Sequence, residues 1–436
     1  MKTKKTTTAA HAGPRKSVSR RTVLKGTAAT AGLAAGSGLI KGFPYVMAQE
    51  QITLRYASTA VTQDTRIADK VREDLGINIQ YIPLTSDDVV KTAVTQPNRF
   101  DILEPEVWMV KKIVPSGNLQ GMDTNRIKYA DDITTVFTKG EVDGKKIGSQ
   151  GTAPVKVVYL EGKNAKTFSK TPTTWMSLVP SVYNADTLGI RPDLIGRPIE
   201  HWHELLNPEF KGKASILNIP SIGIMDAAMV VESMGEHTYG DKGNMTREEI
   251  DLTIRVLTEA KRAGQFRAFW KEFNESVNLM ASGEVVIQSM WSPAVTKVRS
   301  MGVPCIYQPL KEGYRAWASG ISFSKALKGK KLDAAYDFIN WYMSGWAGAF
   351  LNRQGYYAAV LSTAEASMEP YEWDYWMLGK PAARDIKAPD GTIMEKAGAV
   401  RDGGSFNARM GAVACWNAVM DENRYMIRQW NEFIAA

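Results

Sequence analysis

The sequence predicts an α/β protein with two lobes, each a sheet flanked by helices. In the first part of the chain, segments that alternate in polarity with a period of two are interleaved with segments whose apolar residues have helical spacing. A second alternation of the same kind begins near residue 213. Strands that alternate with helices in this way form parallel sheets with right-handed crossovers. The 436 residues are enough for two or three domains with a sizeable core.

The first alternation predicts three strands and two helices, in the order strand, helix, strand, helix, strand. The strands are expected over 51–57, 77–83 and 100–105, and the helices over 66–76 and 86–94. Ligands bind beyond the carboxyl ends of the strands in such sheets. The loops at 58–61 and 104–108 are therefore the first places to expect a site.

The second alternation predicts further strands and helices. The strands are expected over 213–219, 284–290, 304–310 and 318–324, and the helices over 224–235, 246–264 and 331–344. The helix at 246–264 opens with Thr246 and Glu249 in capping-box spacing. An extended segment over 175–190 is expected to leave the first lobe. The stretch 139–173, rich in Lys, Gly, Thr and Ser, predicts a surface excursion.

The positive charge of the chain is confined to its N-terminus. The whole chain has a formal net charge of +8, but residues 1–48 hold nine basic and no acidic side chains. Residues 49–436 therefore carry 45 basic and 46 acidic side chains, a net charge of −1. A basic chain normally points to nucleic acid or an anionic membrane. Here the remainder of the chain is nearly neutral, so that interpretation is set aside.

The first 48 residues are typical of a removable export signal. A basic stretch precedes a weakly apolar run over 26–40, and Val46 and Ala48 stand at positions −3 and −1 of a cleavage point before Gln49. The stretch SRRTVLK, with Arg20 and Arg21, is similar to the twin-arginine motif that a receptor for folded cargo reads. No later segment has 18 unbroken apolar residues, so we expect a soluble mature protein.

Motifs for catalysis and metal binding are missing. The stretch HWHELLN fails the H-E-x-x-H pattern because Asn207 stands at the second His position, although His201 and His203 could bind a metal. There is no G-x-S-x-G motif, no G-x-G-x-x-G after a strand and no complete P-loop. The two cysteines, Cys305 and Cys415, form no scaffold, and the sequence leaves their pairing open.

Several stretches resemble the periplasmic solute-binding proteins of ABC importers, in particular the spermidine/putrescine-binding branch. The stretches are FDILEPEVW, HWHELLNPEFKGKASIL, LMASGEVVIQSMWSPAV, EGYRAWASGISFSKALKGKKLDAAYDFINWYMS and NRQGYYAAV. The resemblance covers most of residues 50–365, and it is weaker over 139–173 and over the C-terminal 70 residues.

The resemblance implies a two-lobed periplasmic-binding-protein fold of type II. Each lobe would be a mostly parallel sheet flanked by helices, with the ligand cleft between lobes that close like a hinged clamp. On this reading, 1–48 is a twin-arginine signal peptide, lobe 1 is 49–180 completed by 317–360, and lobe 2 is 181–316 completed by 361–436.

The family's pocket is an aromatic box with carboxylates for the amines of the ligand, since a cation binds over ring faces and pairs with acids. The resemblance places these ligand-binding residues here: Thr59, Glu106, Trp108, Ser221, Trp291, Trp317, Ser319, Tyr356 and Tyr357.

The main amine-pairing carboxylates of polyamine binders are replaced in this chain. Ser319, Ser221 and Ile224 stand at their positions, while Glu106 and Asp226 lie nearby and could take over one role. A doubly charged polyamine would need such replacements, because unpaired buried charge is costly. An aromatic pocket with hydroxyls, and an acid or Arg315, fits a monoamine, a quaternary ammonium compound, an amino-acid derivative or an organic acid.

The sequence thus predicts a periplasmic solute-binding component of an ABC importer, not an enzyme. Its expected partners are a small organic solute, the permease and ATPase complex at the inner membrane and the twin-arginine export machinery, with no cofactor, no metal and no nucleic acid. A ferric-ion binder, suggested by the adjacent Tyr356 and Tyr357, and a folded periplasmic enzyme with a cofactor are alternatives. An interaction protein without a ligand is a further one.

Overall fold

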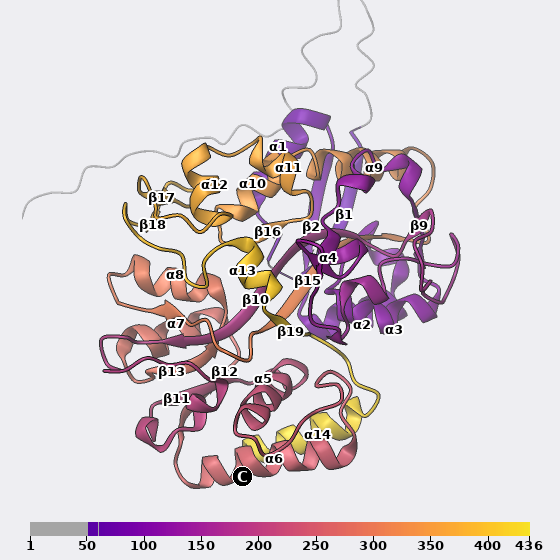
Figure 1. The fold of residues 1–436 in the computed structure, drawn as a ribbon. Helices are drawn as coiled ribbons and strands as arrows, with labels where there is room; N and C mark the ends of the chain where they lie inside the picture. Colours follow the sequence, from indigo (N-terminus) through magenta and orange to yellow (C-terminus); the bar gives the residue numbers. More distant parts are fainter. Residues whose placement is uncertain (1–50, 60) are drawn as a thin grey trace, which may run out of the picture. The chain divides into compact units, whose positions relative to one another are not determined.

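Two long strands run through the centre of the structure, a computed structural model that describes residues 51–59 and 61–436. Strands β10 (Val179–Ile190) and β15 (Tyr314–Ser324) pair antiparallel, from Val179↔Ile321 to Asp186↔Arg315. Every residue of β10 is buried. The two strands stand in the middle of one sheet, with the order β12-β11-β13-β10-β15-β3-β1-β2 (Figure 1). The predicted signal segment 1–48 lies outside the described residues.

On one side of this pair lies a first sheet group of three parallel strands. It contains β1 (Thr53–Ser58), β2 (Asn78–Pro83) and β3 (Ile102–Glu104), with β1 between the other two. Strand β3 joins the group to β15 through antiparallel pairing. The alternation predicted for this part of the chain is confirmed, with α1 (Thr65–Leu75) and α2 (Ser86–Thr95) between the strands.

On the other side lies a second sheet group, again parallel within itself. It contains β11 (Ala214–Leu217), β12 (Phe266–Trp270) and β13 (Ile287–Met290), with β11 in the middle. Strand β13 pairs antiparallel with β10. The two-lobed α/β fold is therefore confirmed: two parallel groups are joined by an antiparallel pair of crossing strands.

The remaining elements cover these groups. The long helices are α5 (Pro220–Ser233), α6 (Arg247–Arg262), α7 (Phe273–Ser282), α8 (Ser292–Ser300), α9 (Gly329–Tyr342) and α14 (Asn423–Ala435). The short helices are α3 (Val110–Ile113), α4 (Thr135–Thr138), α10 (Trp346–Asn352), α11 (Leu361–Glu365), α12 (Pro370–Trp376) and α13 (Phe406–Gly411). The short strands are β4 (Leu119–Gln120), β5 (Met122–Asp123), β6 (Glu141–Val142), β7 (Lys145–Lys146), β8 (Gln150–Gly151), β9 (Trp175–Met176), β14 (Ile306–Tyr307), β16 (Tyr357–Ala358), β17 (Ile386–Lys387), β18 (Ile393–Glu395) and β19 (Val413–Trp416).

The apolar core divides in the same way as the sheet. One cluster packs the first sheet group against α1, α9 and α10, with Leu54, Ile339 and Leu351 among its members. Another packs the second group against α5, α6 and α14, through residues such as Leu257 and Trp430. Helix α6 begins with the predicted capping box, since the side chains of Thr246 and Glu249 each accept from the backbone of the other residue.

The stretch 139–173 differs from its prediction as a surface excursion. Its charged side chains other than that of Glu141 are exposed, but apolar residues such as Ile147, Val157, Val158 and Leu160 are buried in the first core cluster. Strand β8 within it pairs parallel with β19 from the end of the chain. The sequence did not predict this contribution to the apolar core, because the stretch is polar in composition and its buried residues follow neither a helical nor a strand period.

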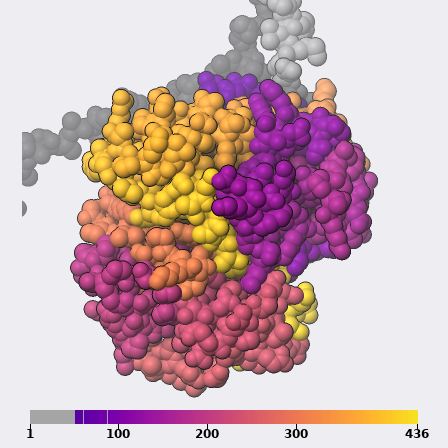
Figure 2. Space-filling model, viewed as in Figure 1, coloured from indigo at the N-terminus to yellow at the C-terminus, as the bar shows by residue number. Residues whose placement is uncertain are grey.

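The last part of the chain contributes to both cores. Trp376, Ile386 and Met410 belong to the first cluster, whereas Trp430 and Phe433 belong to the second. Strand β19, between them in sequence, pairs parallel with β15. In Figure 2 yellow C-terminal residues lie at the surface beside purple and orange segments from elsewhere in the chain. The residue bounds of the lobes stay a prediction.

The burial of Trp430 in helix α14 generates the first testable prediction. Its side chain is fully buried, and its indole N–H donates to Asn218 Oδ1 at 2.9 Å. Replacing Trp430 by Ala leaves a cavity, so we expect the free energy of unfolding to fall by about 3–5 kcal/mol in urea titrations. Ile427→Ala, on the exposed face of the same helix, is the control and should change it by less than about 0.5 kcal/mol. Equal losses for the two variants would contradict the packing of α14.

Candidate functional site

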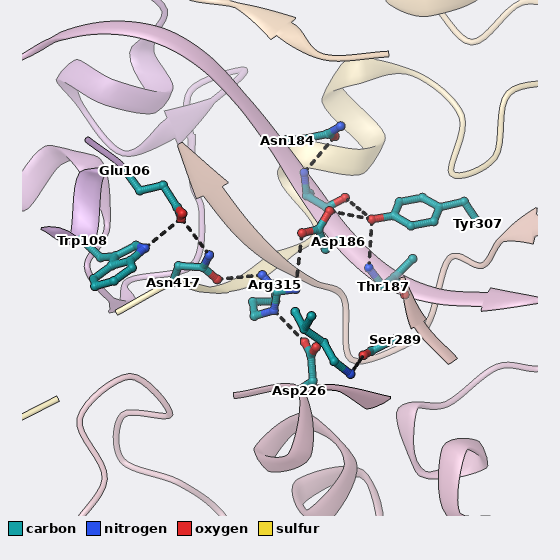
Figure 3. Close-up of polar contacts among 12 residues, drawn as sticks. Glu106, Trp108, Asn184, Asp186, Thr187, Asp226, Ser289, Tyr307, Arg315 and Asn417 are labelled. Atoms are coloured by element: carbon teal, nitrogen blue, oxygen red, sulfur yellow. Dashed lines mark hydrogen bonds and ion pairs between the residues drawn. The ribbon is translucent and has the colours of Figure 1, made fainter. Parts of the chain in front are cut away.

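A buried cluster of charged and amide side chains lies where the two sheet groups meet. It is centred on Arg315 in β15, whose side chain is 2% exposed. The guanidinium Nε donates to Asp226 Oδ1 at 2.6 Å and Nη1 donates to Asn417 Oδ1 at 2.7 Å. A third contact, from Nη2 to Asp186 Oδ2, is 3.3 Å long. Figure 3 shows the side chains of Asp226, Asn417 and Asp186 converging on Arg315.

A second arm of the cluster extends toward the first sheet group. Glu106, two residues after β3, accepts the indole N–H of Trp108 at 2.8 Å and the side-chain amide of Asn417 at 3.3 Å (Figure 3). The backbone of Glu106 also forms a bridge with Ser319 in β15. Asn417 therefore connects Glu106 to Arg315. We call the residues Glu106, Asp186, Asp226, Arg315 and Asn417 the charge cluster.

The strand pattern explains why these residues meet. Arg315, Trp317 and Ser319 alternate along β15 and therefore lie on one face of the strand. Asp186 stands directly opposite Arg315 on β10, on that same face. Asp226 comes from the middle of α5, a helix that is buried on nearly every side.

Burial dominates the electrostatics of the cluster. It raises the pKa of Asp186 to about 6, although Arg315 and the Tyr307 hydroxyl both favour the ionised form. Burial likewise raises the pKa of Asp226 and of Glu106 above the usual range of a carboxyl group. Arg315 stays charged, because its two carboxylate partners raise its pKa against the effect of burial.

Tyr307, from β14, extends the cluster at Asp186. Its O–H lies 2.9 Å from Asp186 Oδ1 and 3.0 Å from the carbonyl oxygen of Ala185. The backbone N–H of Thr187 donates to the same hydroxyl at 3.1 Å (Figure 3). Asp186 is thus held by a neutral donor on one side and by a guanidinium on the other.

The loop after β1 is fixed by a separate buried carboxylate, Glu104 at the end of β3. It accepts hydroxyl hydrogen bonds from Tyr56 at 2.6 Å and from Thr62 and Ser181. Burial raises the pKa of Glu104 despite these donors. Glu104 therefore joins the first sheet group, its β1 loop and the crossing strand β10, two residues before Glu106.

The predicted ligand-binding residues fall into several groups. Glu106, Trp108 and Ser319 lie together, as described above. Trp317 and Tyr356 form an edge-to-face pair with ring centroids 5.9 Å apart, and both are half-buried. Because Trp317 shares the β15 face of Arg315 and Ser319, this aromatic pair lies beside the charge cluster.

The remaining predicted residues stand apart from this group. Trp291 is half-buried and packs edge-to-face on Trp270 at 4.8 Å, in a small apolar cluster with Ile222. Ser221 lies half-buried in the first turn of α5, and Thr59 lies half-buried just after β1. Their part in a site stays a prediction.

Tyr357 is fully buried, with its ring 5.5 Å from that of Tyr183 and 4.9 Å from that of Phe406. Its neighbour Tyr356 instead contacts Trp317, so the two tyrosine rings belong to different contact groups. This separation removes the geometric basis for an adjacent tyrosine pair on one ferric ion.

Three residues of the site were missed by sequence reasoning, although Arg315 and Asp226 were considered. Asp186 carried a signal, since it interrupts a strand that is otherwise apolar or small over 179–190. Asn417 and Tyr307 had no such signal in the sequence, because their contacts join segments that are about 100 residues or more apart in the chain.

Metal and cofactor sites were also considered. Among the described residues, no group of three or more His, Cys, Asp or Glu side chains could hold a metal ion. His201 and His203 stack at 5.1 Å, and their Nδ1 atoms contact Glu312 and Ser233 respectively. Cys305 and Cys415 are buried and unpaired, each in a different core cluster.

Across residues 51–59 and 61–436, no helix is both long and apolar enough to cross a membrane.

Solved structures with the same fold include ABC transporter proteins. The spermidine/putrescine ABC transporter substrate-binding protein of Streptococcus pneumoniae is 16% identical, with a TM-score of 0.58 over 88% of this chain and 99% of that one. A putative spermidine/putrescine ABC transporter from Listeria monocytogenes is 14% identical, with a TM-score of 0.61 over 88% and 98%. A binding protein of A. tumefaciens in complex with agropinic acid is 15% identical, with a TM-score of 0.52 over 88% and 99%.

A search of curated protein sequences finds no match to the chain. A family model, described as bacterial extracellular solute-binding protein, matches residues 66–374, which is well over half of the sequence. With the crossing strands and the two sheet groups already in place, this match identifies the family. The chain belongs to the bacterial extracellular solute-binding proteins.

Proposed function

We propose that this protein captures a solute with a positively charged nitrogen at the charge cluster and delivers it to the permease and ATPase of an ABC importer. The observation that carries this proposal is a charge imbalance: the cluster holds three carboxylates, of which Asp186 and Asp226 are buried and Glu106 is half-buried, against the single guanidinium of Arg315. Excess buried negative charge is costly unless a cation compensates it.

The hydrogen bonds of the cluster support a cationic solute. Asp226 Oδ2 is buried and has no hydrogen-bond partner within residues 51–59 and 61–436. Within the part of the chain that the structure describes, Glu106 accepts hydrogen bonds only from neutral donors, the indole of Trp108 and the amide of Asn417. An ammonium or quaternary ammonium group would supply the missing charge without displacing Arg315. A carboxylate solute would instead meet an acidic cluster whose guanidinium is already engaged by two aspartates.

The aromatic side chains beside the cluster support the same class of solute. Trp317 lies on the strand face of Arg315, and Tyr356 packs against its edge. A cation over an aromatic face gains about 0.5–2 kcal/mol, more when it is desolvated. Glu106 and Asp226 then take the place of the carboxylates that Ser319 and Ser221 replace.

The proposal includes transport without catalysis and action in the periplasm. Its support is the family, whose members bind solutes outside the cytoplasm, and the missing catalytic motifs in the sequence. The twin-arginine machinery would export the chain, and cleavage after Ala48 would release residues 49–436.

Calorimetric titration of the purified protein, after unfolding and refolding to remove bound solute, tests the solute class. The probes are choline, putrescine and γ-aminobutyrate, with the dianion glutarate as the contrast. We expect a cationic probe to bind and glutarate not to bind. Glu106→Gln should weaken that binding about tenfold or more, because a charge-assisted contact contributes about 1.5–3 kcal/mol. Glu200→Gln, which alters an exposed ion pair with Lys311, is the matched control. Tight glutarate binding, or a Glu106→Gln variant with unchanged affinity, would refute the proposal.

The pH dependence of binding gives a second test. Amines and quaternary ammonium ions stay charged below about pH 9, so any change in affinity reports on the protein. Burial raises the pKa of Asp186 to about 6 and raises those of Glu106 and Asp226. As pH falls through about 6, Asp186 takes up a proton, and Glu106 and Asp226 take up theirs at a higher pH than ordinary carboxyl groups do, so the negative charge that attracts the cation is lost. We expect the affinity to fall over that range, and affinity that is constant down to about pH 4.5 would contradict a site of ionised carboxylates.

The export route is tested by replacing both Arg20 and Arg21 with Lys in the full chain. We expect the uncleaved precursor to accumulate in the cytoplasm, as seen by fractionation and immunoblotting. Arg15→Lys, outside the paired arginines, should leave export intact. Normal amounts of processed protein in the periplasm of the double variant would exclude the twin-arginine route.

A further inference from the structure

A second set of buried cations lies outside the charge cluster, in the segment that joins β18 to β19. Arg401 and Arg409 have side chains that are 4% and 1% exposed. Arg409 belongs to α13, which lies beside β10 in Figure 1, and Arg401 precedes that helix. The proposed solute site uses neither residue.

Arg401 is buried and has no carboxylate partner among the described residues. Its Nη1 donates to the backbone carbonyl of Trp376, and its guanidinium carbon lies 5.0 Å from the ring centroids of both Tyr357 and Trp376. Within residues 51–59 and 61–436, no acidic side chain forms an ion pair with Arg401, and its Nη2 has no hydrogen-bond acceptor. Burial and the nearby Arg409 both lower the pKa of Arg401.

Arg409 adds a second positive charge whose partners are uncharged oxygens. Its Nη2 donates to Asn184 Oδ1 and to the Ala185 carbonyl, both at 3.3 Å, and its Nη1 donates to the Asp402 carbonyl at 3.2 Å. Its Nε has no acceptor among the described residues. The nearby carboxylate of Asp402 is already engaged by Arg299 and by the backbone N–H of Tyr307.

The two rings that Arg401 contacts each carry a further donor without an acceptor. These are the hydroxyl of Tyr357 and the indole N–H of Trp376, both buried. The region around Arg401 therefore combines excess positive charge with excess hydrogen-bond donors. Burying such groups without compensation is costly, and an anion compensates both the charge and the donors at once.

We propose that Arg401, with Tyr357, Trp376 and Arg409 around it, binds a small monovalent anion, either chloride or the carboxylate of a formate-sized acid. A guanidinium, a phenol and an indole N–H are all donors suited to such an ion. We expect the rings of Tyr357 and Trp376 to limit the site to small anions. The bound anion would attach the segment that carries Trp376 and Arg401 to β16, where Tyr357 stands.

Thermal unfolding of the purified protein at constant ionic strength tests this inference. Sodium chloride, or sodium formate in a second arm, replaces sodium gluconate, whose anion is too large for the site. We expect the unfolding midpoint to rise with the small anion and to saturate, as mass action requires for an ion bound to the folded state. The arm with the larger shift identifies the anion. Midpoints that match those in gluconate in both arms would overturn the proposal.

Two variants locate the effect. Arg401→Met should lose the anion-dependent shift, while the exposed Arg428→Met on α14 should keep it in full. Tyr357→Phe removes only the hydroxyl and should weaken the dependence several-fold, so the test survives if Arg401→Met fails to fold. Broadening of the ³⁵Cl signal by the parent protein, and its loss on adding excess formate, provides a readout that needs no variant. An anion-dependent shift that persists in Tyr357→Phe at full size, or in Arg401→Met, would refute the assignment.

Discussion

The ion pair between Arg315 and Asp226 is the interaction on which the centre of this protein depends. Arg315 stands on a crossing strand, and Asp226 stands on a helix that packs against the second sheet group. Their 2.6 Å contact is buried, so each group is tolerable there only while the other is present. Through Asn417 the same guanidinium is connected to Glu106, beside the first sheet group. One side chain thus joins both halves of the sheet and the end of the chain.

If the charge cluster captures a cationic solute as proposed, the same arrangement would couple solute binding to closure of the two halves. Glu106 and Asp226 belong to opposite halves, and Arg315 satisfies only part of their negative charge. A cation placed between them gains from both carboxylates only when the halves are together, which is how a ligand shifts a hinge equilibrium. An uncharged solute of the same shape would lack this differential interaction and would favour closure less. In the proposed function, the excess of acid over base would therefore serve both the selection of the solute and the closure of the two halves.

The parts of this fold that were predictable are those that depend on local pattern. The alternation around Ile67 and Val71, and the capping box of Thr246 and Glu249, are short-range signals, and the structure has these elements where they were expected. The resemblance to solute-binding proteins placed Trp317, Glu106 and Ser319, which lie on or beside one strand face.

Contacts between distant segments were not predictable. Asn417 reaches Glu106 across 311 positions, and no local spacing encodes that meeting. Val157 and Leu160 are buried within a polar stretch, because β8 there pairs with a strand from the end of the chain. The sequence shows Asp186 as an acidic residue within an expected buried strand, but it does not show that Arg315 is its partner. The features that the sequence did not predict are therefore mostly contacts between distant segments, because neither segment alone carries a pattern that indicates its partner.

Tyr307 lies between the charge cluster and the buried arginines Arg401 and Arg409, and it shows how the two sets of charges act on each other. Its hydroxyl contacts Asp186, and its ring lies 5.1 Å from the guanidinium carbon of Arg409. The positive charge of Arg409 favours the ionised form of Asp186, against the burial that raises the pKa of this carboxyl to about 6. An anion beside Arg401 would offset part of that positive field, and a cation at Glu106 would act in the opposite direction on Asp186. The protonation of Asp186 therefore depends on both groups together, so the two proposed ions would not bind at electrostatically independent sites.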